Sequence, residues 1–178
     1  MMTSKDLIAT IRTVPDYPIP GILFYDVTTL FKNPKALRAI VDMTYELYKD
    51  KGITKVVGIE SRGFVLGSAL AVKLGAGFVL ARKPGKLPAE VVSESYDKEY
   101  GKDTVEIHKD AVSEDDVVLV HDDLLATGGT VGAVNRLVRQ FNPKRIYDNF
   151  IIELPALRGR QHIPEGTPVT ALLQLEGE

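Results

Sequence analysis

The segment from Val117 to Thr130 constrains the fold more than any other part of the sequence. It opens with four apolar, mostly β-branched residues, which predict a buried parallel strand over 117–120. Two aspartates and the small residues Ala-Thr-Gly-Gly-Thr follow, and apolar residues then recur at helical spacing as far as Phe141. A strand, a small-residue loop and a helix in this order place backbone N–H groups at a helix N-terminus, where they can hold a phosphate.

Asp122 and Asp123 immediately precede this predicted phosphate loop. Two carboxylates at one strand end repel each other unless a cation or hydroxyl groups meet them. Beside a phosphate site they can reach the hydroxyls of a sugar that carries the phosphate, so the pattern indicates a ribose 5-phosphate site. The alternative is that Gly128-Gly129 forms a helix-entry turn without a ligand. The sequence lacks both G-x-x-x-x-G-K-[ST] and a helix-opening G-x-G-x-x-G, which excludes a P-loop NTPase and the dinucleotide-binding fingerprint.

Strands alternate with helices along the 178 residues, which predicts an α/β fold with a mostly parallel sheet in a single domain. Residues 83–103 are rich in Lys, Gly, Pro and Glu and predict a long mobile excursion. Asn33-Pro34 predicts a helix start, with Asn as the cap. Further helices are expected from Thr3 or Ser4, over 64–74 and up to 141, and strands over 55–59, 78–82, 104–109, 117–120, 146–153 and 169–175.

Composition excludes several classes of protein. The chain has no cysteine, which rules out disulfides and thiol chemistry and fits a cytoplasmic protein, and three scattered histidines argue against structural zinc. A net charge of −2 gives no overall attraction to nucleic acid. No apolar run approaches the roughly 20 residues of a membrane span, and no signal-peptide core is visible, so we expect neither a membrane nor a nucleic-acid partner.

The run Asp-Asp-Leu-Leu-Ala-Thr-Gly-Gly-Thr resembles the phosphoribosyl diphosphate (PRPP) binding motif of the type I phosphoribosyltransferases, in the spelling of their adenine-specific members. Segments 17–26, 58–64, 82–88 and 99–102 also resemble this family, in order and at plausible spacing, so the resemblance covers the chain almost end to end. It implies one domain over 1–178, with a small hood over about 1–30 and a lid loop over about 83–103.

The resemblance also implies a reaction, in which a purine ring nitrogen attacks C1 of PRPP and gives AMP and pyrophosphate when the base is adenine. Mg²⁺ is the implied cofactor, and a homodimer is the implied assembly. Another purine (hypoxanthine, guanine or xanthine) is the alternative, although 151–157 lacks the lysine that typically meets a 6-oxo group in the hypoxanthine–guanine enzymes. A PRPP-sensing regulator on the same fold is disfavoured, because the chain has no room for an added domain and retains Glu99-Tyr100.

The family's binding residues carry over to this sequence in three groups. Those implied to bind the 5-phosphate and the ribose are Ala126, Thr127, Gly128, Gly129 and Thr130, with Asp122 and Asp123, the last two also reaching Mg²⁺. Those implied to meet the diphosphate are Glu60, Ser61, Arg62, Arg82 and Lys86. Those implied to bind adenine are Phe24 by stacking, Leu23 and Tyr25 through their main chain, and Leu154 from the other side of the pocket.

Glu99 and Tyr100 are the implied catalytic residues of the lid, acting together with Arg62, Arg82 and Lys86. A closing lid excludes water and so prevents hydrolysis of PRPP. Two alternatives stay open for Glu99, which can stabilise positive charge on the ribose or take a proton from the base. Two also stay open for His121, which is either a satisfied, partly buried histidine or a hydrogen-bond partner of the acid pair.

Overall fold

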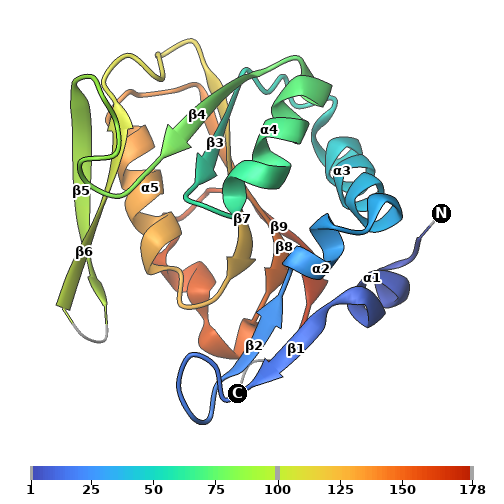
Figure 1. Ribbon diagram of the computed structural model, residues 1–178. Helices are drawn as coiled ribbons and strands as arrows, with labels where there is room; N and C mark the ends of the chain where they lie inside the picture. The colour runs from blue at the N-terminus through green and yellow to red at the C-terminus, as the bar shows by residue number, and fades with distance from the viewer. Residues whose placement is uncertain (1, 99–100, 177–178) are drawn as a thin grey trace.

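A five-stranded parallel sheet forms the centre of the molecule. The computed structural model describes residues 2–98 and 101–176 (Figure 1). The strands lie in the order β4-β3-β7-β8-β9, and every neighbouring pair is parallel. Their bounds are Lys55–Ile59 (β3), Gly77–Ala81 (β4), Val117–Leu125 (β7), Arg145–Glu153 (β8) and Val169–Gln174 (β9). The predicted α/β fold is therefore confirmed, but β7 continues five residues beyond the predicted 117–120, so both aspartates belong to the strand.

Helices cover both faces of the sheet (Figure 1). The bounds are Ser4–Thr10 (α1), Thr28–Phe31 (α2), Pro34–Tyr48 (α3), Gly63–Leu74 (α4) and Gly129–Arg139 (α5). The α3 start is confirmed, because Asn33 Oδ1 accepts hydrogen bonds from the first-turn N–H groups of Lys35 and Ala36 at 3.0 and 3.2 Å. Thr3 likewise caps α1. Within the described residues, none of these helices combines the length and apolar character that a membrane crossing requires.

Two apolar layers, one on each face of the sheet, explain why the sequences of the strands are continuously hydrophobic. On one face, Val120 and Phe150 pack with Val134 and Leu137 of α5. The other face is buried beneath α3 and α4, where the packing residues include Ile40, Leu66, Leu70 and Ile152. Because parallel strands are covered on both sides, alternation with polar residues is suppressed in their sequence.

Two antiparallel hairpins lie outside the central sheet (Figure 1). The first joins β1 (Arg12–Pro15) to β2 (Leu23–Asp26), and the second joins β5 (Val91–Lys98) to β6 (Gly101–His108). The predicted long excursion over 83–103 does lie outside the central sheet, and from Val91 onward it contains β5 and the start of β6, which pack beside α5. Its mobility stays a prediction. The polar run Ser93-Glu94-Ser95 interrupts the apolar signal of β5, so composition alone did not predict a strand there. The roles of 1–30 as a hood and 83–103 as a lid stay predictions.

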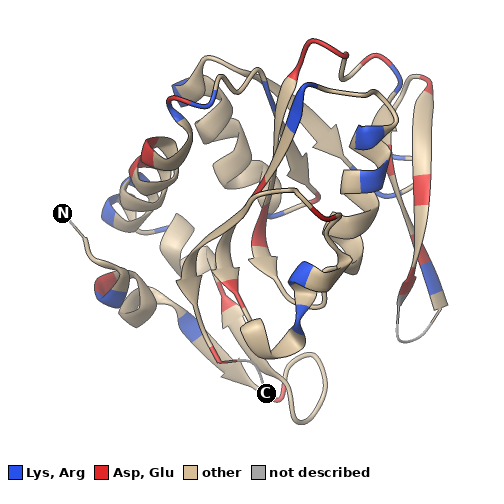
Figure 2. Ribbon diagram, turned by 180° about the vertical axis from the view of Figure 1, so that it is seen from behind, with Lys and Arg blue, Asp and Glu red and all other residues tan. Residues whose placement is uncertain are grey.

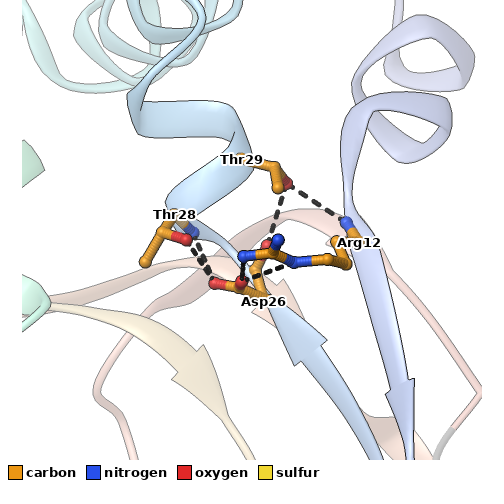
Figure 3. A network of polar contacts seen from close by, with 4 residues as sticks. All are labelled: Arg12, Asp26, Thr28 and Thr29. Atoms are coloured by element: carbon orange, nitrogen blue, oxygen red, sulfur yellow. Dashed lines mark hydrogen bonds and ion pairs between the residues drawn. The ribbon is translucent and has the colours of Figure 1, made fainter.

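Asp26 fastens the first hairpin to α2 (Figure 3). Its carboxylate accepts hydrogen bonds from Thr28 Oγ1 at 2.6 Å and from Arg12 Nε at 3.0 Å. The Thr28 hydroxyl and the Arg12 guanidinium together lower the Asp26 pKa to about 2. Thr29 completes the network, because its hydroxyl donates to the Asp26 carbonyl and accepts from the Arg12 N–H. The network fixes the direction in which β2 leaves the body of the protein.

The order of the strands creates a crevice at one edge of the sheet. β3 and β7 are neighbours, yet the helices that follow them, α4 and α5, lie on opposite faces. In open α/β sheets, ligands bind outside the carboxyl ends of the strands at such a switch point. The segments that leave β3 and β7, namely 60–62 and 126–128, are therefore the walls of the candidate site.

Candidate active site

The loop between β7 and α5 has the geometry of an anion cradle. Gly128 is the N-cap of α5 and has φ +82°, a left-handed conformation that favours glycine. The N–H groups of the first helical turn have no partner within the helix and are available to a ligand. A hollow of about 100 Å³ opens here, and its lining includes Asp122 and the predicted phosphate residues 126–130. The structure thus brings the predicted phosphate loop and one acid together.

Gly159 supports this loop from below, and the sequence analysis missed it. It opens the 3₁₀ turn Gly159–His162 after β8. A Cβ atom on Gly128 would lie 2.1 Å from the Gly159 carbonyl oxygen, and one on Gly159 would lie 2.3 Å from the Ala126 carbonyl oxygen. The two backbones are in contact at a spacing that only glycine permits. A glycine 31 residues after Gly128 carries no local signal of this contact.

An ion pair between a buried glutamate and a half-exposed arginine holds the 3₁₀ turn in place, and it too was missed. Arg160 donates to both oxygens of Glu153 at 2.6 and 2.7 Å, a bidentate pair at the end of β8. Hydrogen bonds from the Arg160 guanidinium lower the Glu153 pKa. The pair anchors the residue next to Gly159, so it acts on the phosphate loop through that contact.

The acid pair lies near the carboxyl end of β7 and is largely buried, while its ribose-binding role stays a prediction. Asp123 is 4% exposed and pairs with Arg62, whose Nε lies 2.5 Å from Asp123 Oδ2. Asp122 accepts a hydrogen bond from the Asp123 N–H at 2.9 Å. Burial, followed by the charge of Asp123, raises the Asp122 pKa well above its ordinary value. This carboxyl is poised to ionise when a cation or a hydroxyl group offers it a partner.

Arg62 lies between the acid pair and an aromatic ring. Its guanidinium carbon lies 5.6 Å from the centroid of the Phe24 ring, and its Nε binds Asp123. Burial opposes its charge, but the Asp123 and Asp122 carboxylates raise the Arg62 pKa. The Tyr17 ring meets Phe24 edge-on, at 5.0 Å between centroids. Two predicted groups, the ribose acids and the base-stacking ring, are therefore joined by a residue predicted to bind diphosphate.

Glu60 and Arg82 form a second ion pair on the same edge. Arg82 donates to Glu60 Oε1 from Nη2 at 2.7 Å, and the Lys83 N–H donates to Glu60 Oε2 at 2.9 Å. These hydrogen bonds lower the Glu60 pKa. Arg82 also donates to the Lys86 carbonyl at 3.2 Å, so the two predicted cations lie on one tight turn. Glu60 orients Arg82 through this pair, and the contact of Glu60 with the diphosphate stays a prediction. The Glu60–Ser61 peptide is cis, and Ser61 is exposed.

The predicted base-binding residues lie on two elements. Leu23, Phe24 and Tyr25 belong to β2, which pairs with β1 along one edge. The Tyr25 hydroxyl donates to the Glu176 carbonyl at 2.7 Å, so the Tyr25 side chain is bonded to the C-terminal segment. Leu154 is buried in the α3–α4 apolar layer, against which Tyr25 also packs. Its N–H donates to the Leu125 carbonyl at 3.0 Å, which places it beside the end of β7.

His121 does not bind the acid pair through its imidazole. Its ring is fully buried, and Nδ1 lies 2.9 Å from Asn149 Oδ1. Asn149 in turn donates to Thr170 Oγ1 at 2.9 Å, so the three side chains cross β7, β8 and β9 in register. Burial lowers the His121 pKa to about 4, which keeps the ring neutral. These contacts favour the first alternative over a bond to the acid pair, but they correct it in two respects. The side chain is fully rather than partly buried, and its Nε2 has no hydrogen-bond partner among the described residues.

Several carboxylates lie within the central sheet, on β7 and β8. In Figure 2, acidic segments interrupt the central strands, whereas Lys and Arg lie mainly on helices and connecting segments. The predicted catalytic residues Glu99 and Tyr100 lie outside the described residues, so their assignment stays a prediction. Among the described residues, no group of three or more His, Asp or Glu side chains is arranged to hold a metal by itself.

Comparison with known proteins identifies one family. Residues 26–157 match the family model described as phosphoribosyl transferase domain. The adenine phosphoribosyltransferase of Phocaeicola vulgatus is 67% identical over 174 residues, covering 98% of this chain and all of the relative. A crystal structure of adenine phosphoribosyltransferase from Rhodothermus marinus superposes with a TM-score of 0.91 at 49% identity, covering 97% of this chain and 98% of that one. The Giardia lamblia enzyme complexed with 9-deazaadenine gives a TM-score of 0.93 at 43% identity, with 99% of each chain covered.

Proposed function

Because the chain belongs to the phosphoribosyl transferase family, among its adenine phosphoribosyltransferases, we propose that it transfers the 5-phosphoribosyl group of PRPP to adenine in a Mg²⁺-dependent reaction. The products are AMP and pyrophosphate. As a pentosyltransferase acting on free adenine, it serves purine salvage. We place this reaction in the cytoplasm, which a chain without cysteine suits.

One observation carries the proposal: Arg62 spans from Asp123 to the Phe24 ring, while Asp122 lines the hollow of the phosphate loop. A ribose 5-phosphate fits this order of groups. Its phosphate meets the N–H groups at the start of α5, its hydroxyls meet the carboxylates, and the base at C1 meets the aromatic ring. Binding the phosphate and the hydroxyls orients the reacting carbon between the base and the diphosphate.

The reaction breaks the bond between C1 and the diphosphate and forms a bond between C1 and a ring nitrogen of adenine. Charge therefore builds on the departing diphosphate, and cations on that side favour its departure. Arg82 and Lys86 supply them, with Arg82 oriented by Glu60. Glu99 and Tyr100 are the proposed lid residues, acting on C1 or on the base. Exclusion of water from C1 prevents hydrolysis in place of transfer.

The residues present suit a Mg²⁺ ion that arrives with the substrate. Mg²⁺ commonly binds through one or two carboxylates together with substrate phosphates rather than in an all-protein cage. Asp122 and Asp123 supply two carboxylates, and the raised pKa of Asp122 marks a group that a cation would ionise. When bound, Mg²⁺ would neutralise negative charge on the diphosphate.

We further propose a homodimer that covers an exposed apolar patch, defined as Val65 and Val72 of α4 with Leu80 of the edge strand β4. These side chains are 43%, 83% and 37% exposed, although their type is usually buried. A Val72→Glu variant should shift the mass measured by light scattering from that of a dimer to that of a monomer. A dimeric mass for this variant would remove the patch from the interface.

The experiment that tests the function is pyrophosphate release from PRPP and Mg²⁺, with adenine, hypoxanthine, guanine, xanthine and orotate supplied separately. We expect release with adenine alone. Release with an oxopurine would retain the transfer reaction but overturn the assignment of Phe24 and Leu154 to adenine. Binding of PRPP without release by any base would indicate a sensor of PRPP.

A further inference from the structure

Tyr96 of β5 reaches from the second hairpin to the phosphate loop. The Thr130 hydroxyl donates a hydrogen bond to the Tyr96 hydroxyl at 2.9 Å. The Tyr96 ring also covers Gly129, because a Cβ atom on that glycine would lie 3.3 Å from Tyr96 Cδ2. Tyr96 is half-buried and packs on the apolar layer beneath α5. Tyr96 therefore contacts two consecutive residues of the predicted phosphate site, at the first turn of α5.

The Tyr96 hydroxyl continues the hydrogen bonds toward the diphosphate side. It donates to Asp103 Oδ2 at 3.2 Å, and the same oxygen accepts from Lys83 Nζ at 2.7 Å. Lys83 follows Arg82, and its N–H binds Glu60. A continuous chain of hydrogen bonds therefore joins Thr130, in the 5-phosphate loop, to the segment that carries the proposed diphosphate ligands.

The chemistry of these groups makes the chain reversible. A threonine hydroxyl has one proton to donate and lone pairs to accept with, whereas a phosphate oxygen only accepts. When a phosphate occupies the loop, the Thr130 hydroxyl must turn its proton toward it. The Tyr96 hydroxyl can then turn from Asp103 and donate to Thr130, while Asp103 keeps its ion pair with Lys83. The oxygen positions need not change.

We propose that Tyr96 is a positioning residue for the 5-phosphate of the substrate, acting through the Thr130 hydroxyl and the backbone at Gly129. This inference rests on the proposed function, because it assigns the phosphate to a phosphoribosyl ligand. Tyr96 holds the Thr130 hydroxyl oxygen in place. When the Thr130 hydroxyl donates to phosphate, its oxygen accepts a hydrogen bond from the Tyr96 hydroxyl. No residue of the phosphate motif itself provides this hydrogen bond.

Tyr96→Phe retains the ring over Gly129 and removes only the hydroxyl. We expect the KM for PRPP and the Kd for ribose 5-phosphate to rise about 3- to 10-fold, the size of one neutral hydrogen bond. The KM for adenine, kcat and Tm should stay close to those of the unmodified protein. Thr130→Val removes the hydroxyl on the other side, and in that background Tyr96→Phe should change the Kd by less than about twofold.

Two variants separate positioning from hairpin docking. Glu94→Gln weakens the 2.7 Å ion pair between the hairpin and Arg136 of α5, and Ser95→Ala removes the 2.9 Å cross-strand bond to Thr104. These contacts lie at Arg136 of α5 and at Thr104 of β6, away from the phosphate loop, so both variants should bind ribose 5-phosphate normally. An equal loss in Glu94→Gln, a normal Kd in Tyr96→Phe, or additive effects with Thr130→Val would each overturn the inference.

Absence of turnover in the unmodified protein would refute the proposed function, and this inference with it. Normal turnover with an unchanged Tyr96→Phe would refute this inference alone.

Discussion

The buried carboxyl of Asp148 should make a contribution to the stability of this protein that falls as pH rises. Asp148 is fully buried beneath α5, where its two oxygens accept from the Asn135 amide nitrogen at 2.9 Å each. Burial raises its pKa from 3.8 to about 7. Between these values the folded state keeps a proton that the unfolded state has lost, so the free energy of unfolding decreases with pH. The decrease is roughly 1.4 kcal/mol per pH unit and ends above pH 7, at roughly 4 kcal/mol in total.

Asp148→Asn removes this titration and should stabilise the protein at high pH. The side-chain amide oxygen of Asn135 (Oδ1) is buried and has no hydrogen-bond partner among the described residues. An amide at position 148 can donate to that oxygen while still accepting from the Asn135 nitrogen. The stability gained over the unmodified protein should therefore grow by about 3 kcal/mol between pH 5 and pH 8. Urea unfolding at fixed protein concentration, at four pH values, measures this difference.

Asp116→Asn is the matched control. Burial opposes ionisation of Asp116, but hydrogen bonds from Thr54 and Ser113 lower its pKa, so its stabilising contribution is present above its unfolded pKa and is lost as pH falls through the lower folded value. This variant should be less stable than the unmodified protein at pH 8. Parallel pH curves for Asp148→Asn and the unmodified protein, or a loss of stability in Asp148→Asn at pH 8, would refute the account of a buried, reluctantly ionised carboxyl.

Three further predictions concern the site and its support. Asp122→Asn combined with Asp123→Asn should reduce pyrophosphate release at least about a thousandfold with an unchanged circular dichroism spectrum, since the pair is proposed to hold the ribose; near-normal turnover would contradict that role. Gly159→Ala should raise the KM for PRPP at least about tenfold without changing that for adenine, because its Cβ would lie 2.3 Å from the Ala126 carbonyl oxygen. Asp26→Asn should cost about 1–2 kcal/mol at pH 7 and little below pH 2, because the stabilisation from its lowered pKa is present above pH 4 and lost as pH falls through 2; equal losses at both pH values would exclude the ionic contribution.

The sequence predicted much of this protein because its strongest signals are local. An apolar run, two acids and a glycine pair within 14 residues fix a strand, a loop and a helix start, and the structure keeps that order. Asn33 and Pro34 likewise act within one turn of the helix that they begin. Where the composition was polar, as over 91–98, local signals failed, because the pairing of β5 with β6 satisfies backbone groups that composition does not report.

What only the tertiary structure decided are contacts between segments far apart in the chain. Arg62 was identified from the sequence, but its place between Asp123 and Phe24 depends on two strand ends and a hairpin meeting at one edge. Neither Gly159 nor Tyr96 belongs to a recognisable motif. Each gains its role from the group that it contacts, the Ala126 carbonyl for Gly159 and the Thr130 hydroxyl for Tyr96. Short segments of the sequence therefore determine which residue types form the proposed phosphoribosyl site. The orientation of those residues is set by neighbours that only folding brings into contact.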